Sequence, residues 1–87
     1  MATLSVSLVS AEQEVWSGEA SLVVAKTVIG EIGFMAGHEP VLAILAQGEV
    51  RITREDGTKV IANAQDGFVS VANNEVTIVA GEAALIS

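Results

Sequence analysis

Apolar and polar residues alternate along several short stretches of this chain, which is the pattern of half-buried β-strands. In residues 3–8, leucine or valine stands at every even position and serine or threonine at every odd position. Residues 49–54 alternate in the same way, with Val50 and Ile52 on the apolar face. No stretch of ten or more residues has the 3.6-residue period of an amphipathic helix. The pattern predicts an all-β protein.

Turn signals separate the alternating stretches. Asp56-Gly57 and Asn73-Asn74 predict tight hairpins, because these residues tolerate the positive φ that such turns require. Gln47-Gly48 and Asp66-Gly67 predict further breaks between strands, and Ser17-Gly18 predicts a bulge or bend. Seven or more short strands, with a turn signal about every 8–12 residues, predict an antiparallel β-sandwich or flattened barrel.

Three apolar stretches are less regular. Residues 20–28 are largely apolar on both faces, which predicts a strand covered on both sides. Residues 41–46 are too uniformly apolar to fix a period; a strand and a helical turn both fit, and we favour an extended path. Residues 81–87 are predicted to be helical or frayed.

Residues 30–40 depart from the strand pattern. They contain Gly30, Gly33 and Gly37 and end with the single histidine and the single proline of the chain. Glycine is favoured where φ must be positive or where another backbone approaches closely. We therefore expect a shaped loop that is neither a regular strand nor a helix. Because Ile32, Phe34 and Met35 are apolar, the loop is expected to contact a partner.

Composition restricts the possible partners. The chain of 87 residues is predicted to form one domain, residues 1–87, with a mainly aliphatic core, since it has one tryptophan, two phenylalanines and no tyrosine. Its net charge of −7 argues against nucleic acid and suits a basic protein partner. It has no cysteine, no apolar run near the ~20 residues of a membrane helix and no visible signal peptide. A soluble intracellular domain is expected.

Little in the sequence indicates catalysis. His38 with Glu31 or Glu39 is the only candidate base–acid pair, and a loop histidine bonded to its own backbone is the favoured interpretation. The glycines are not followed by the lysine of a phosphate-binding loop, and metal ligands are not clustered. We predict no catalytic, cofactor-binding or metal-binding residue. Trp16 is interpreted as a cap on the core or as a binding residue, and both remain open.

Two other interpretations concern basic residues. Arg51, Arg54 and Lys59 lie on one predicted hairpin, which is typical of a solvated face. A carrier domain for a swinging cofactor would need an exposed lysine flanked by methionines, and neither Lys26 nor Lys59 has that flank. A binding module is therefore favoured over an enzyme or a carrier.

Several segments, in order along the chain, resemble the epsilon subunits of bacterial F-type ATP synthases. They are residues 9–18, Gly30-Glu31-Ile32-Gly33, Gly37-His38-Glu39-Pro40, residues 48–52, Asp66-Gly67-Phe68 and residues 74–80. The resemblance implies a β-sandwich in the central stalk of the rotor, without an active site or bound nucleotide. Its partners would be the gamma subunit and the c-ring, at the cytoplasmic side of the bacterial plasma membrane. The residues implied to face the c-ring are Gly30, Glu31, Ile32, Gly33, Phe34, Met35, Gly37 and His38.

Two departures from the family limit what is carried over. The family commonly continues into two C-terminal helices that inhibit ATP hydrolysis and in some members bind ATP, so neither property is carried over to a chain that reads to Ser87. The residues before Gly37 are Phe34-Met35-Ala36, whereas the family more usually has a proline before this glycine. The alternative function is a free-standing β-sandwich that binds a ligand, for which few aromatic residues are available.

Overall fold

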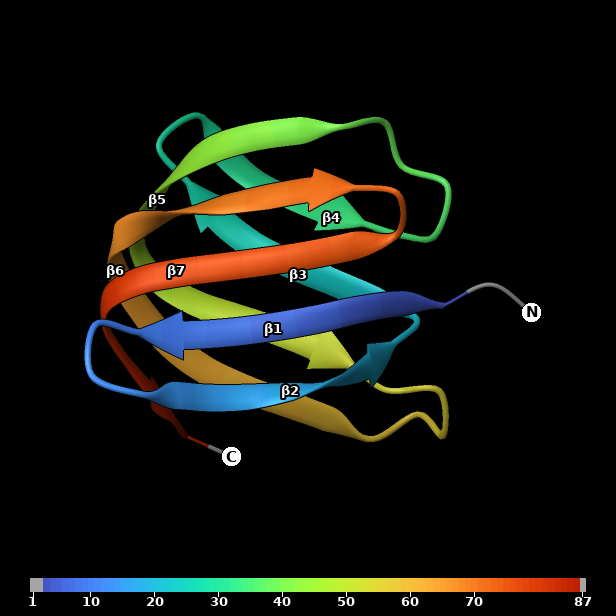
Figure 1. Cartoon of the computed structure of the whole chain (residues 1–87), viewed down its shortest axis with the longest axis horizontal. Helices are drawn as coiled ribbons and strands as arrows, with labels where there is room; N and C mark the ends of the chain where they lie inside the picture. The colour runs from blue at the N-terminus through green and yellow to red at the C-terminus, as the bar shows by residue number, and fades with distance from the viewer. Residues whose placement is uncertain (1–2, 87) are drawn as a thin grey trace.

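The regular elements of the protein, seen in a computed structural model that describes residues 3–86, are β-strands. Within that range they form one seven-stranded sheet with the strand order β2-β1-β7-β6-β5-β3-β4 (Figure 1). The prediction of an all-β fold is confirmed. The strands are β1 (Leu4–Ser10), β2 (Glu14–Ala20), β3 (Leu22–Thr27), β4 (Gly30–Phe34), β5 (Val41–Thr53), β6 (Lys59–Ala72) and β7 (Glu75–Leu85).

The prediction of an antiparallel arrangement is correct for most strand pairs and wrong for one. Strands β1 and β7 pair in parallel, with Ser5 opposite Glu75 and Ser10 opposite Ala80. Turn signals determine the relative direction only of strands that a hairpin joins. Strands β1 and β7 lie at opposite ends of the chain, so no turn signal bears on their pairing.

The strands β5 and β6 are 13 and 14 residues long, and each passes through a position where a break was predicted. The predicted breaks at Gln47-Gly48 and Asp66-Gly67 are therefore wrong. Asp66 has a φ of 61°, and a Cβ at Gly67 would lie 1.7 Å from the carbonyl oxygen of Val79. These residues bend the sheet instead of ending a strand, and β6 and β7 curve around one side of the molecule (Figure 1).

Because the sheet curves, its inner side encloses one core. The largest fully buried side chains are aliphatic apart from Phe34, as the composition predicts. They come from strands on both sides of the bend in the sheet. This is consistent with a β-sandwich, although the strands form a single hydrogen-bonded sheet. Those largest buried residues are Phe34, Leu4, Leu8, Ile52, Ile78, Val23, Val50, Val69, Val71 and Val76.

Trp16 lies partly buried against the edge of this core, which supports its interpretation as a cap. A Cβ at Gly18 would meet two ring carbons of Trp16 at 3.0 Å, so glycine leaves room for the indole. The bulge predicted at Ser17-Gly18 is not found there, because Ser17 and Gly18 pair with Ser7 and Val6 in unbroken register. The register of β1 and β2 shifts nearby, since Leu8 faces Trp16 and Val9 faces Glu14.

The tight hairpins were predicted correctly. Asp56-Gly57 joins β5 to β6, with a φ of 88° at Gly57. Asn73 and Asn74 join β6 to β7, with φ values of 51° and 61°. The extended path for residues 41–46 is also confirmed, since they begin β5.

Two other expectations are wrong in part. Residues 81–85 continue β7 as a strand that pairs with the first half of β6, so they are not helical. The prediction also covered Ser87, which lies outside the described residues, as do Met1 and Ala2. The apolar stretch 20–28 is interrupted at Ser21, and Leu22 and Val24 are only half-buried on the outer face of β3. Val28 is exposed at the end of that stretch.

Candidate functional site

The glycine-containing stretch consists of an edge strand and a loop. Residues 30–34 form β4, which pairs with β3, so the prediction that this segment cannot be a regular strand is wrong. Gly30 and Gly37 have positive φ values of 124° and 88°, but Gly33 does not. A Cβ at Gly33 would make only ordinary contacts, at 3.7 Å with Leu22 and 3.9 Å with Val24. Only residues 35–40 form the loop.

The side chains of this stretch differ in exposure. Glu31, Gly33 and Gly37 are exposed, Met35 is 62% exposed, and Ile32 and His38 are half-buried. Phe34 is fully buried and belongs to the core. A partner would therefore meet Glu31, Met35 and His38 at this surface, while Phe34 supports the loop from inside.

Hydrogen bonds determine the shape of the loop. The backbone N–H of His38 donates to the carbonyl oxygen of Met35 at 3.1 Å. The N–H of Gly37 donates to Oδ1 of Asn74 at 2.7 Å. The loop thus lies beside the β6–β7 turn, and the two are at the same end of the molecule (Figure 1).

The side chain of His38 is directed to the backbone of the next residue, close to the favoured interpretation of a loop histidine bonded to its own backbone. Its Nδ1 lies 2.7 Å from the carbonyl oxygen of Glu39. Because a carbonyl only accepts hydrogen bonds, Nδ1 carries the proton and Nε2 is the acceptor in the neutral ring. The ring meets Phe34 edge-on, with 5.1 Å between the centroids. This packing links the exposed loop to the core.

Glu31 has a different partner. Its Oε2 lies 3.3 Å from Nη2 of Arg51, and Nε of Arg51 lies 3.5 Å from Oε1 of Glu49. Arg51 is on β5, Glu31 is on β4, and β3 lies between them in the sheet. The candidate base–acid pair of His38 and Glu31 is therefore not assembled, since each side chain has a different partner.

Sequence considerations missed two of these residues. Arg51 was assigned to a solvated face, and Asn74 was assigned only to a hairpin. Nothing in the local sequence marks either one, because the contacts depend on which strands are neighbours in the sheet. The alternation that points Arg51 outward from β5 was the only available signal.

A second exposed surface, which we call the apolar face, was also missed. Ile44 on β5 stands opposite Phe68 on β6, and the N–H of Val28 donates to the carbonyl oxygen of Ile44 at 3.0 Å. The five side chains of this face are between 41% and 82% exposed, and adjoining exposed apolar residues often mark an interaction surface. The apolar face consists of Val28, Ile29, Leu42, Ile44 and Phe68.

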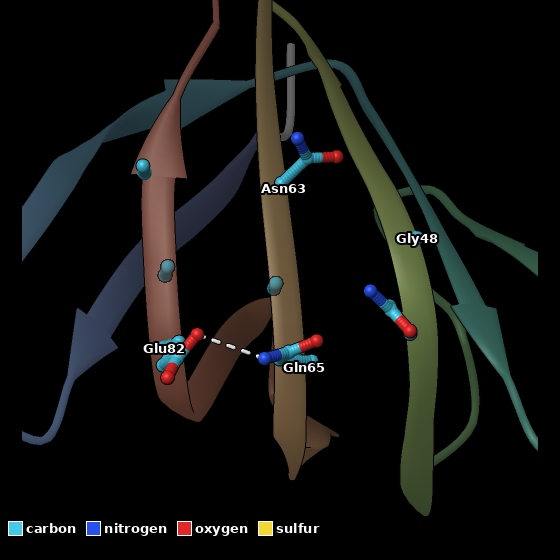
Figure 2. Close-up of a pocket in the computed structure, with 8 residues that line it drawn as sticks. Gly48, Asn63, Gln65 and Glu82 are labelled. Atoms are coloured by element: carbon cyan, nitrogen blue, oxygen red, sulfur yellow. Dashed lines mark hydrogen bonds between the residues drawn. The ribbon is translucent and has the colours of Figure 1, made fainter.

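A groove of about 630 Å³ lies across β5, β6 and β7 near the bend of the sheet. Figure 2 shows Gln65 of β6 turned toward Glu82 of β7, with Nε2 donating to Oε2 at 2.8 Å. The groove is otherwise lined largely by small or amide side chains: Gln47, Gly48, Asn63, Ala64, Ala83 and Ala84. Nothing in this lining is typical of a catalytic centre.

Residues 3–86 offer neither a metal-binding cluster nor a membrane-spanning helix. No three His, Asp or Glu side chains in this range are grouped as the ligands of a metal ion would be. The same range contains no helix that is both long enough and apolar enough to cross a bilayer.

Comparison with known proteins identifies the family. Residues 3–86 match the family described as "ATP synthase, Delta/Epsilon chain, beta-sandwich domain". The chain is 50% identical over 84 residues to the ATP synthase epsilon chain of Streptomyces coelicolor, covering 97% of this chain and 68% of that protein. It is 51% identical over 85 residues to the ATP synthase epsilon chain of Micrococcus luteus, covering 98% of this chain and 93% of that one.

Solved structures agree with the sequence comparison. A chain in the cryo-EM structure of the Euglena gracilis mitochondrial ATP synthase (OSCP/F1/c-ring) superposes with a TM-score of 0.91 at 26% identity. That match covers 98% of this chain, which spans 54% of the Euglena chain. A chain of the Tetrahymena thermophila mitochondrial ATP synthase central stalk and c-ring shares the fold, with a TM-score of 0.75 at 19% identity. The resemblance to epsilon subunits is confirmed, and the chain belongs to the delta/epsilon family of ATP synthase subunits.

Proposed function

We propose that this chain is a non-catalytic subunit in the central stalk of an F-type ATP synthase, where it couples rotation of the c-ring to ATP synthesis. The observation that carries this proposal is the extent of the family match, which covers residues 3–86. The relatives named epsilon chain share about 50% sequence identity with this chain over nearly its whole length. The chain contributes contacts and stiffness to the complex, and catalysis belongs to other subunits.

Such a subunit must bind two partners at once, and the structure offers two surfaces of different character. The apolar face suits a lasting contact, because its exposed Leu42, Ile44 and Phe68 would leave water when covered. We assign this face to the gamma subunit. The curved sheet with its continuous core joins it to the second surface without a flexible linker.

The second surface comprises β4 and the loop of residues 35–40, and we assign it to the polar loops of the c-ring. Glu31 and His38 offer hydrogen-bonding groups there, Met35 offers an exposed apolar side chain, and the edge of β4 offers backbone groups. These are contacts of the kind found at the rim of an interface, and they favour specificity and orientation over affinity.

Residues 1–87 form one domain, and the two parts of its curved sheet act as the two layers of a β-sandwich. The chain works at the cytoplasmic side of the bacterial plasma membrane and is peripheral to it through the complex. The relatives named above are bacterial, which supports that location.

Co-purification tests the assignment to the stalk. The chain would be co-expressed with the gamma subunit of the same complex, and the mixture would be separated by size exclusion. We expect a stoichiometric complex that subsequently binds detergent-solubilised c-ring. Elution of the chain as a free monomer, with gamma eluting separately, would contradict the proposal and would favour a free-standing ligand-binding domain.

A further inference from the structure

Asn74 connects three parts of the chain that are distant in sequence. Its Oδ1 accepts a hydrogen bond from the N–H of Gly37 at 2.7 Å, and its carbonyl oxygen accepts one from the N–H of Ser5 at 2.8 Å. The first bond joins the turn between β6 and β7 to the loop between β4 and β5. The second joins the same turn to the start of β1. Asn74 therefore lies where two turns and a strand meet.

The turn itself does not explain an asparagine at this position. Asn73 and Asn74 are the two residues between β6 and β7, and both have positive φ. In a two-residue hairpin of this kind glycine is favoured at the second position, since it adopts positive φ without strain. Glycine would thus serve the turn at least as well. What asparagine adds is a side-chain acceptor, and that acceptor is bonded to Gly37.

The loop is held in position by this bond together with the edge-on packing of His38 on Phe34. Its other recorded hydrogen bonds are local: His38 N–H to the Met35 carbonyl, and His38 Nδ1 to the Glu39 carbonyl. Gly37, with a φ of 88°, is an exposed glycine with large conformational freedom. Within residues 3–86, the bond to Asn74 is the one hydrogen bond recorded between residues 35–40 and a distant turn.

We propose that Asn74 is a positioning residue for the c-ring-facing loop. It holds Gly37 and, through Gly37, sets the place of the adjacent His38 relative to Glu31 on the edge strand. Asn74 need not touch the c-ring itself. This inference rests on the proposed function of the loop, and it adds a residue outside the loop that determines how well the loop binds.

Three variants separate the side-chain bond from the turn. Asn74→Gly keeps the turn and removes the acceptor, while Asn74→Asp keeps an oxygen acceptor and still tolerates positive φ. Asn73→Gly is the matched control, because Asn73 lies in the same turn and has no side-chain hydrogen bond recorded among residues 3–86. Each variant would be examined as the whole chain, free and in complex with gamma.

Two measurements are made on each variant. The first is hydrogen exchange of the Gly37 amide by NMR, which reports the bond without any partner. The second is the affinity of the gamma–epsilon complex for detergent-solubilised c-ring. For Asn74→Gly we expect Gly37 exchange to rise and ring affinity to fall, each by about fivefold, as the loss of one hydrogen bond implies. Asn74→Asp and Asn73→Gly should stay within about twofold of the parent.

The outcomes distinguish this proposal from the proposed function. Unchanged exchange at Gly37 in Asn74→Gly would overturn the role of the side chain. Suppose that Asn74→Gly speeds exchange at Gly37 but leaves ring affinity unchanged, while His38→Ala does lower ring affinity. Asn74 would then not be a positioning residue, but the assignment of the loop to the c-ring would stand. If Glu31→Ala and His38→Ala together had no effect on ring affinity, the assignment of the loop would fail first and the role of Asn74 with it.

Discussion

Arg51 on β5 reaches across β3 to Glu31 on β4, with 3.3 Å between Nη2 and Oε2. The same guanidinium lies 3.5 Å from Glu49, so it is shared between two carboxylates. Arg51 and Glu31 are 47% and 53% exposed, and ion pairs this exposed contribute little to stability. The pair instead restricts the direction in which Glu31 points from the edge of the sheet.

We expect Arg51→Gln to change the free energy of unfolding by less than about 1 kcal/mol, because water screens the pair it removes. Urea denaturation measures this change, with Lys59→Gln as a control at an exposed basic residue for which no ion pair is recorded in residues 3–86. A loss well above 2 kcal/mol from Arg51→Gln alone would show that the pair holds the strands together, contrary to this interpretation.

Gly67→Ala should strongly destabilise the protein. The added Cβ would lie 1.7 Å from the Val79 carbonyl oxygen, which is backbone and cannot move aside as a side chain can. We expect a loss of about 2–3 kcal/mol or more in the free energy of unfolding. Gly33→Ala is the control, since its nearest atoms would be 3.7 Å away, and it should stay within about 1 kcal/mol of the parent. Equal stability of the two variants would disprove the close packing at the bend.

Ile44→Glu should weaken binding to gamma, since it places a charge in the centre of the apolar face. The side chain is 61% exposed in the free chain, so folding should be little affected. We expect at least a roughly tenfold loss of affinity, as for a central interface residue. Leu85→Glu changes a side chain of comparable exposure, 48%, on another strand, and is the control. Similar losses for both variants would show that gamma does not bind at the apolar face.

The pKa of Asp56 provides a test that is independent of partners. It lies below the ordinary value of 3.8, chiefly because the Thr58 hydroxyl donates to Asp56 and then because the Thr58 N–H does. Since the folded-state pKa is lowered, the stabilisation is present above the ordinary pKa and is lost as the pH falls through the lower, folded-state pKa. A carbon-detected NMR titration should show this lowered pKa, and Thr58→Val should move it back toward the ordinary value. An Asp56 pKa above the ordinary value would contradict the hairpin geometry.

Local sequence signals identified several of the positions with positive φ, although Gly33 is not one of them, and they did not show whether the chain reverses direction at those positions. Asp56-Gly57 and Asp66-Gly67 are the same dipeptide, and each contains a residue with positive φ: Gly57 at 88° and Asp66 at 61°. The first closes a hairpin, while the second bends a continuous strand. The difference arises because Gly67 packs against the backbone of β7, a contact that no local pattern contains.

The candidate site was predictable only in part, for the same reason. The glycine pattern and the family resemblance pointed to residues 30–38, and Glu31, Met35 and His38 do present side chains at that surface. Phe34 was expected there and is buried. In the apolar run of residues 41–46, alternate side chains face outward, so Leu42 and Ile44 are exposed at the surface. Which face a strand leaves open depends on the neighbouring strands.

The most direct test of the central claim is proton-driven ATP synthesis in reconstituted vesicles that contain the complex with either the parent chain or a Glu31→Ala/His38→Ala double variant. If these residues contact the c-ring as proposed, each substitution should weaken docking by about 0.5–2 kcal/mol without unfolding the sheet. The account predicts that the double variant binds the c-ring more weakly and synthesises ATP more slowly, while its binding to gamma is unchanged. Unchanged ring binding together with an unchanged rate of synthesis would contradict it.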